Sequence, residues 1–100
     1  MAVDLIFTSE VEWDISDAYE WYEEQRVGLG EEFLTSVDAC VKQILRNPTM
    51  YARVHEEYRR ALTRRFPYAI FYEVVDETVS IYAILHAARE PNKWRRRLSR

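Results

Sequence analysis

The segment from Phe66 to His86, FPYAIFYEVVDETVSIYAILH, is the strongest guide to the fold because it contains two strongly predicted strands joined by two polar residues. Phe66–Val75 is rich in aromatic and β-branched residues, which favour extended structure, and Thr78–His86 has a similar composition. Asp76 and Glu77 form a short polar turn between them. The segment therefore predicts two adjacent strands, with Pro67 near the start of the first strand or at an edge of the sheet.

Two further strands are predicted closer to the N-terminus. Tyr58–Arg65 (YRRALTRR) can form a strand whose exposed positions are basic. Ala2–Thr8 (AVDLIFT) alternates apolar and polar residues and predicts an opening strand. Thr49–Glu57 is a poorly defined connector, and the basic tail Asn92–Arg100 can form a helix.

Two helices are predicted between the opening strand and Pro48. The first begins at Ser9, where Ser9 and Glu12 match a capping box, and continues to about Arg26. The second runs from Glu31 to about Asn47 and has an almost ideal apolar stripe, made by Phe33, Leu34, Val37, Cys40, Val41, Ile44 and Leu45. Because only a short break around Gly28 and Gly30 separates them, the helices should form an antiparallel hairpin.

These elements predict one α+β domain over residues 1–100, with the order β-α-α-β-β-β. We expect an antiparallel sheet with the helical hairpin packed on one face. No apolar run approaches the roughly 20 residues of a membrane span, and no signal peptide is recognisable, so we expect a cytoplasmic protein without membrane contact. The single Cys40 lies on the apolar stripe and is expected to be a buried thiol.

Charge divides the chain into two unlike parts. Met1–Ala52 has 11 Asp and Glu against 3 Lys and Arg, a net charge of −8. Arg53–Arg100 has 6 against 11, a net charge of +5, so the whole-chain value of −3 conceals a strong dipole. Guanidinium groups suit bidentate pairing with phosphate or carboxylate, which predicts that the basic part contacts nucleic-acid machinery or an acidic protein segment.

The familiar catalytic signatures are missing. The chain has no GxGxxG, P-loop or GxSxG motif, and one cysteine with two distant histidines cannot make a structural zinc site. Glu20, Glu23 and Glu24 lie within one helical turn, but a solvated helix face explains them better than a metal site. We therefore expect neither a metal nor a cofactor.

Residues at the end of the last strand, together with residues in and beside the preceding strands, could support RNA cleavage. It needs a base, an acid and a cation for the phosphate, and His86, Tyr68 or Tyr72, and Arg64, Arg65 or Arg89 could supply them. The competing interpretation is structural, with His86 hydrogen-bonded at the rim of the sheet and Arg89 paired with a nearby acid. The tail that includes Trp94, Arg95, Arg96 and Arg97 could contact nucleic acid or an acidic partner, or its Trp94 and Leu98 could dock on the core.

Two segments of the chain resemble a known family. They are Arg65–Val74 (RFPYAIFYEV) and Ile84–Pro91 (ILHAAREP) with Trp94 just after. Together with the opening strand and the helical hairpin, they make the whole chain resemble toxins of the RelE/ParE superfamily from bacterial type II toxin–antitoxin, or plasmid stabilisation, systems. The resemblance implies a small toxin that a co-expressed antitoxin neutralises, and a target that is either DNA gyrase, as for ParE-like members, or messenger RNA in the ribosomal A site, as for RelE-like members.

The pattern of the RelE-like nucleases is only partly present. Those enzymes carry an arginine directly after the tyrosine that matches Tyr68, and here that position is Ala69. Arg89 matches their arginine after the last strand, but no tyrosine stands near Trp94, where their catalytic tyrosine aligns. A nuclease reading would have to rest on His86, Arg89, Arg65 and Tyr68, whereas the LHxxRxP ending is ParE-like.

Three hypotheses follow from the sequence. The leading one is a ParE-like gyrase inhibitor without catalytic turnover, whose target-binding residues are His86, Arg89, Trp94, Arg95, Arg96 and Arg97. The alternatives are a ribosome-dependent endoribonuclease and an antitoxin-binding module with weak or lost toxicity. We expect the antitoxin at the apolar surface between the hairpin and the sheet, bordered by Arg59, Arg60, Arg64 and Arg65, a surface that could support homodimers in its absence.

Overall fold

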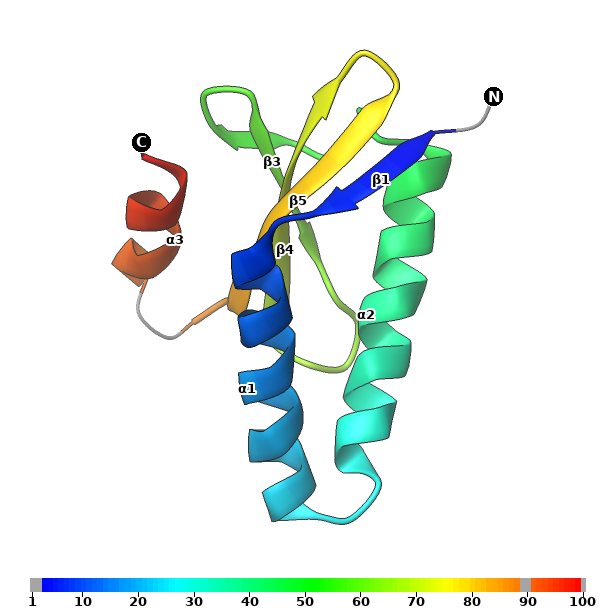
Figure 1. Ribbon diagram of the computed structural model, residues 1–100, viewed down its shortest axis with the longest axis vertical. Coiled ribbons are helices and arrows are strands. Elements are labelled where there is room, and N and C mark those ends of the chain that lie inside the picture. The colour runs from blue at the N-terminus through cyan, green and yellow to red at the C-terminus, as the bar shows by residue number, and fades with distance from the viewer. Residues whose placement is uncertain (1–2, 89–90, 100) are drawn as a thin grey trace.

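The centre of the molecule is the predicted pair of strands, β4 (Tyr68–Val75) and β5 (Thr78–His86). They pair antiparallel, and Asp76 in the turn between them has a positive φ of 55°. This computed structural model describes residues 3–88 and 91–99. Figure 1 shows the two strands as long central arrows, with the other elements arranged around them. The hairpin predicted from composition and the polar turn is confirmed.

The sheet has five strands in the order β1-β5-β4-β3-β2. The outer strands are β1 (Asp4–Phe7), β2 (Arg53–His55) and β3 (Tyr58–Leu62). The sheet is mixed, because β1 runs parallel to β5, so the expectation of a purely antiparallel sheet was wrong on this point. Alternation of apolar and polar residues predicts a strand but does not tell whether it runs parallel or antiparallel to its neighbour. The direction of β1 is set by where it joins the next helix.

The segment Thr49–Glu57, which was expected to be a connector, contains β2. Glu56 adopts a positive φ of 50° and allows the chain to turn directly into β3. β3 ends at Leu62, three residues before its predicted end, because Thr63 donates a hydrogen bond to the carbonyl oxygen of Phe66 (2.7 Å) and closes a turn. Arg65 in that turn has a φ of 74°, outside the range of a strand.

The helical hairpin consists of α1 (Ser9–Gln25) and α2 (Leu29–Arg46). The predicted capping box is absent, since Thr8 precedes the first turn and no side chain caps it. The amide of Thr8 still donates to the carbonyl oxygen of Ile81 (3.1 Å), which keeps Thr8 extended and makes Ser9 the first helical residue. The helix therefore begins where sheet pairing ends.

The connection between the helices is organised by one carboxylate. Glu23 accepts hydrogen bonds from the amides of Gly28 (3.0 and 3.1 Å) and Gly30 (2.9 Å), which are among the free N–H groups at the start of α2. Gly28 has a φ of 90°, a conformation that glycine adopts without strain. As a result α2 begins at Leu29, two residues before its predicted start.

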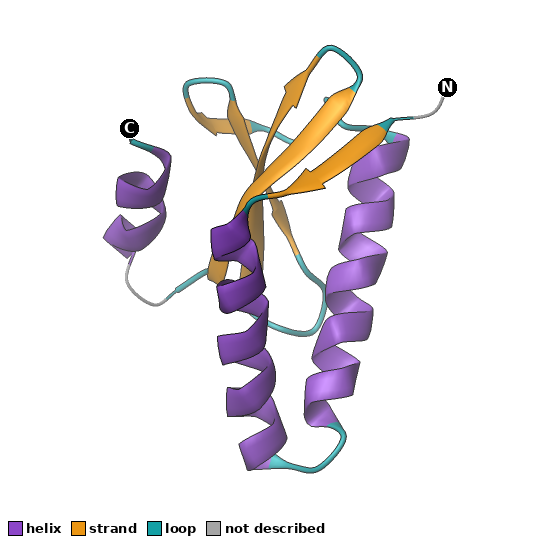
Figure 2. Ribbon diagram, viewed as in Figure 1, coloured by secondary structure: helices purple, strands orange, loops and turns teal. Residues whose placement is uncertain are grey.

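Two apolar clusters hold the layers together. The larger lies between the helical hairpin and one face of the sheet and includes Phe33, Ile44, Ile70, Tyr72 and Ile81. The smaller lies on the other face, where Leu98 of α3 (Pro91–Leu98) covers Ala69, Phe71, Ala83 and Leu85. Figure 2 shows α1 and α2 as two long helices side by side, with the short α3 apart from them. The predicted helix in the basic tail is confirmed.

A bulge in β5 keeps the side chains of this strand on the faces where the two apolar clusters lie. Phe71 pairs with Ala83 but the next residue, Tyr72, pairs with Ile81, so Tyr82 is an additional residue in β5. Past this point the side chains of β5 would otherwise exchange faces, because they alternate strictly along a strand. In the part of the chain that the structure describes, no helix is long and apolar enough to cross a membrane.

Candidate functional site

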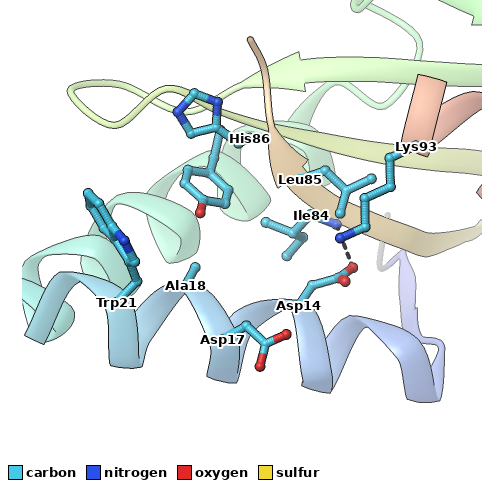
Figure 3. A pocket seen from close by; sticks show the side chains of 9 residues that line it. Asp14, Asp17, Ala18, Trp21, Ile84, Leu85, His86 and Lys93 are labelled. Carbon is cyan, nitrogen blue, oxygen red and sulfur yellow. Dashed lines mark hydrogen bonds between the residues drawn. The ribbon is translucent and has the colours of Figure 1, made fainter. Parts of the chain in front are cut away.

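A pocket of about 240 Å³ lies beside the C-terminal half of β5, between α1 and α3. We call it the β5 pocket, and it is lined by Asp14, Asp17, Ala18, Trp21, Tyr68, Ile84, Leu85, His86 and Lys93. Figure 3 shows Trp21 and His86 on one side of the pocket, Lys93 on the other and the two aspartates below. It forms here because β1 pairs with β5 only as far as Ile81, which leaves the outer edge of the last residues of β5 without a neighbouring strand.

His86 and Tyr68 meet in this pocket, as the sequence suggested they could. Their rings lie 5.4 Å apart in an edge-to-face contact, and both side chains are half-buried. The Nδ1 atom of His86 accepts a hydrogen bond from the amide of Ala88 (3.2 Å) and thereby shapes the chain after β5. Tyr68 also contacts Phe33 of α2 at 5.0 Å. These contacts give both rings a structural role at the rim of the sheet.

Asp14 is the group that ties the pocket to the rest of the fold. Its carboxylate accepts hydrogen bonds from the amide of Ile84 (3.0 Å) and from the guanidinium of Arg97 (2.8 and 3.1 Å). The side chain of Asp14 is only 7% exposed and that of Arg97 only 12%. Arg97 also donates to the carbonyl oxygen of Tyr82 (3.2 Å) and lies 3.4 Å from Glu10. One ion pair thus joins α1, the bulged edge of β5 and α3.

The ion pair with Asp14 favours the charged form of Arg97. Hydrogen bonding to Asp14 raises the pKa of Arg97, because the paired carboxylate stabilises the charged guanidinium. Arg97 was expected among the target-binding residues, and the structure directs its side chain inward. The sequence-based expectations gave Asp14 no role, although its spacing of three from Val11 and four from Ala18, both buried, placed it beside the apolar stripe.

Those residues named for RNA cleavage that the structure describes do not converge around a common point. Arg65 forms an ion pair with Glu32 on α2, and Arg64 is exposed. Tyr72 is fully buried and donates its hydroxyl to the carbonyl oxygen of Pro48 (2.6 Å). Arg89 lies outside the described residues. The structure brings the described candidates His86 and Tyr68 together in the β5 pocket, whereas Arg64 and Arg65 line a different pocket.

Ala69, which stands where the nuclease pattern has an arginine, lies on the opposite face of β4 from Tyr68. It is completely buried, in the cluster that α3 covers. The ring of Trp94 stacks on Phe71 at 5.2 Å and 16°, and Leu98 is 2% exposed. Trp94 and Leu98 are therefore docked on the core, as one of the two alternatives for the tail predicted. Apolar side chains occupy this face of the sheet.

Two arginines of α3 face solvent instead. Arg95 and Arg96 are exposed, and the Arg95 guanidinium lies 5.3 Å from the centre of the Trp94 ring. Because Trp94 and Leu98 anchor the inner side of the helix, the outer side presents positive charge on a fixed support. Among the tail residues proposed for target binding, these two are the exposed cations that the structure describes.

A second pocket of about 520 Å³ lies between α2 and β3. We call it the α2–β3 groove, and it is lined by Glu32, Thr35, Ser36, Ala39, Cys40, Gln43, Met50, Tyr51, Leu62, Arg64 and Arg65. Met50 and Leu62 are 60% and 57% exposed, so the groove offers apolar side chains to solvent. The antitoxin was expected at this surface between the hairpin and the sheet.

The arginines expected around the groove have different environments. Arg64 and Arg65 line it, and the Arg65 hydrogen bond, followed by that of Arg26, lowers the pKa of Glu32. Arg60 is exposed on β3. Arg59 instead donates to the carbonyl oxygens of Thr49 (3.1 Å) and Tyr51 (2.6 Å), so it fastens the connector to the sheet.

Comparison with known proteins gives a consistent result. The family model described as the ParE toxin of the type II toxin–antitoxin system parDE matches residues 5–91. A curated protein named Toxin ParE2, from two strains of Mycobacterium tuberculosis, is 30% identical over 83 residues, which cover 82% of this chain and 79% of the relative. A solved structure titled "Chromosomal ParDE TA system from P. aeruginosa" has the same fold, with a TM-score of 0.64 at 19% identity over 85% of this chain and 96% of the other.

Proposed function

Because the chain belongs to the family of ParE toxins of type II toxin–antitoxin systems, we propose that it inhibits DNA gyrase in the cytoplasm and that a cognate antitoxin neutralises it. The inhibition is by binding, without catalytic turnover by the toxin itself. The burial of Ala69 beneath α3 is the observation that favours gyrase over messenger RNA as the target.

The burial of Ala69 supports a binding function for an energetic reason. An arginine at this position could stabilise the developing charge on a phosphate, and the loss of one such group typically costs about 3 kcal/mol of transition-state stabilisation. Nothing in the described surroundings replaces it, because the neighbours of Ala69 in its cluster are Phe71, Ala83, Leu85 and Leu98. Inhibition by binding does not need a group that stabilises charge on a phosphate.

We place the contact with gyrase on the outer side of α3 and the adjoining rim of the β5 pocket. Arg95 and Arg96 supply exposed charge, and His86 lies at the end of β5 beside the chain that leads to α3. Trp94 and Arg97 act indirectly, since their contacts with Phe71 and Asp14 fix the helix in position. Arg89 belongs to the proposed surface by its place in the sequence and lies outside the described residues.

We place the antitoxin in the α2–β3 groove. A partly apolar groove with arginines at its rim suits an acidic, amphipathic segment that folds when it binds. Met50 and Leu62 offer apolar contacts, and Arg60 and Arg64 offer charge for carboxylates. Without that segment, the same apolar surface could pair two copies of the toxin.

The test is inhibition of DNA supercoiling by purified gyrase. The wild-type protein should block supercoiling at micromolar concentration, and Arg95→Ala/Arg96→Ala should raise the inhibitory concentration about tenfold. Lys42→Ala/Arg46→Ala removes the same charge from the exposed side of α2 and should leave inhibition unchanged. No inhibition at micromolar excess would contradict the proposal. In that case, A-site messenger cuts with programmed ribosomes would identify a nuclease, and the absence of growth arrest would identify an antitoxin-binding module.

A further inference from the structure

The outer side of α1 carries two exposed tryptophans. Trp13 is 72% exposed and Trp21 is 43% exposed. They are eight residues apart, which corresponds to about 12 Å along a helix, and both lie within an arc of about 100°. Trp13, Asp17, Glu20, Trp21 and Glu24 share this arc, and we call them the α1 face. Exposed indole rings so arranged are typical of binding surfaces rather than of solvated helix surfaces.

The charge of α1 is not balanced within the helix. Ser9–Gln25 contains seven Asp and Glu and no Lys or Arg. The fold uses three of these carboxylates, because Glu10 and Asp14 contact Arg97 and Glu23 binds the amides of the helix connection. Asp17, Glu20 and Glu24 form no hydrogen bond or ion pair within residues 3–88 and 91–99.

These three carboxylates oppose the stability of the helix that carries them. Residues three or four apart are neighbours on a helix, so Asp17 repels Glu20 and Glu20 repels Glu24. Glu20 and Glu24 also lie toward the C-terminal end of α1, where the helix dipole favours positive charge. A pattern that is locally unfavourable and that no folded contact repays is expected at functional surfaces.

We propose that the α1 face binds a basic polypeptide segment of a partner, with Arg or Lys side chains stacked on Trp13 and Trp21 and paired with Asp17, Glu20 and Glu24. Cations bind preferentially over the face of an indole ring, and nearby carboxylates strengthen the attraction. The same charges repel nucleic acids and anionic lipid. They also disfavour a symmetric contact with a second copy, in which one acidic face would meet another.

This surface differs from the two that the proposed function uses. None of the residues of the α1 face lines the α2–β3 groove, where the antitoxin is placed. The contact with gyrase is placed on α3 and the rim of the β5 pocket, which the α1 face meets only through Asp17 and Trp21; Figure 3 shows both on the side of α1 that borders this pocket. Trp13, Glu20 and Glu24 do not line it. The binding of a basic segment does not require that the protein inhibit gyrase, so the two proposals succeed or fail independently.

The test is isothermal titration with a 12-residue peptide of alternating arginine and alanine, blocked at both ends, at about 150 mM salt. Trp13→Ala/Trp21→Ala keeps the charge of the protein and should weaken binding at least tenfold, which corresponds to about 1.4 kcal/mol. Trp13→Ala alone removes the more exposed ring and should weaken binding about threefold. This single variant keeps the test valid if the loss of Trp21, which contacts Tyr22, disturbs the fold.

Matched variants separate a specific site from general attraction. Glu20→Gln/Glu24→Gln should weaken binding about tenfold, whereas Asp76→Asn/Glu77→Gln removes the same charge from an exposed turn and should change it less than twofold. A peptide with glutamate in place of arginine should not bind. Equal binding by the tryptophan variants and wild type, or equal weakening by the two charge-removal pairs, would overturn the proposal. So would a wild-type dimer in sedimentation that Trp13→Ala dissociates, because the face would then bind a second copy.

Discussion

Replacing Asp14 with alanine should destabilise the protein more than any substitution of an exposed carboxylate on α1. The change removes two hydrogen bonds to Arg97 and one to the amide of Ile84, and it leaves a guanidinium that is only 12% exposed without its main partner. Breaking a buried ion pair from one side costs about 3–5 kcal/mol. An unpaired buried amide adds about 1–3 kcal/mol when considered alone.

These contributions overlap, and two features reduce their total. Glu10 remains 3.4 Å from Arg97, and Arg97 keeps its hydrogen bond to the carbonyl oxygen of Tyr82. We therefore expect a loss of about 3 kcal/mol, at the lower end of the range for a broken buried pair. For a domain of this size, each kcal/mol corresponds to a fall in Tm of about 4–8 °C, so Tm should fall by about 12–24 °C.

The assay is urea denaturation followed by circular dichroism, for Asp14→Ala, Arg97→Met and the double variant. Because the two side chains contact each other, the double variant should lose less stability than the two single variants added together, by at least about 1.5 kcal/mol. Asp17→Ala on the same helix is the control and should change stability by less than about 0.5 kcal/mol. A loss below about 1 kcal/mol for Asp14→Ala, or additive single effects, would refute the argument that this pair joins α1, β5 and α3.

Three further predictions concern the interior. Burial raises the pKa of Tyr72 to about 12, so the unfolded chain loses this proton first. The stability that this tyrosine contributes is fully present below about pH 10 and should decline as the pH rises toward 12. Tyr72→Phe should reduce this decline in denaturation curves measured at several pH values, at a cost of about 1 kcal/mol for the lost bond to Pro48, and an unchanged decline would count against the prediction. Burial raises the pKa of the Cys40 thiol to about 11, so iodoacetamide at pH 8 should label Cys40 only after unfolding, and labelling of the native protein at the rate of a free thiol would be the contrary result. Gly30→Ala should cost about 1–3 kcal/mol in urea denaturation because the new Cβ would lie 2.8 Å from the ring of Tyr19, and a neutral effect would mean that this ring moves aside freely.

Except for β2, the elements that the structure describes could be predicted from the sequence, because each has a local cause. β4 and β5 follow from a dense run of β-forming residues on both sides of Asp76 and Glu77, and α2 follows from its apolar stripe. The resemblance carried by RFPYAIFYEV and ILHAAREP was also available from the sequence, and the matched family confirms it.

The details that were wrong depend on contacts from outside the element. Ser9 does not cap α1 because β5 holds the Thr8 amide and Thr8 takes the cap position, and α2 begins at Leu29 because Glu23 binds the amides at its start. β1 is parallel to β5 although its residue pattern fits either direction. Such bonds join residues distant along the chain, and a local pattern contains no information about them.

The same distinction applies to the candidate sites. Which side chains carry charge and which helix faces are apolar can be read directly from the order of the residues, because those properties belong to single residues and to the fixed period of a helix. The inward direction of Arg97 toward Asp14, the outward direction of Arg95 and Arg96 and the place of Ala69 beneath α3 are known only from the folded chain. Whether a charged side chain is a structural tie or part of a binding surface depends on what the folded chain places beside it, since desolvation and pairing act between residues that only the fold brings together.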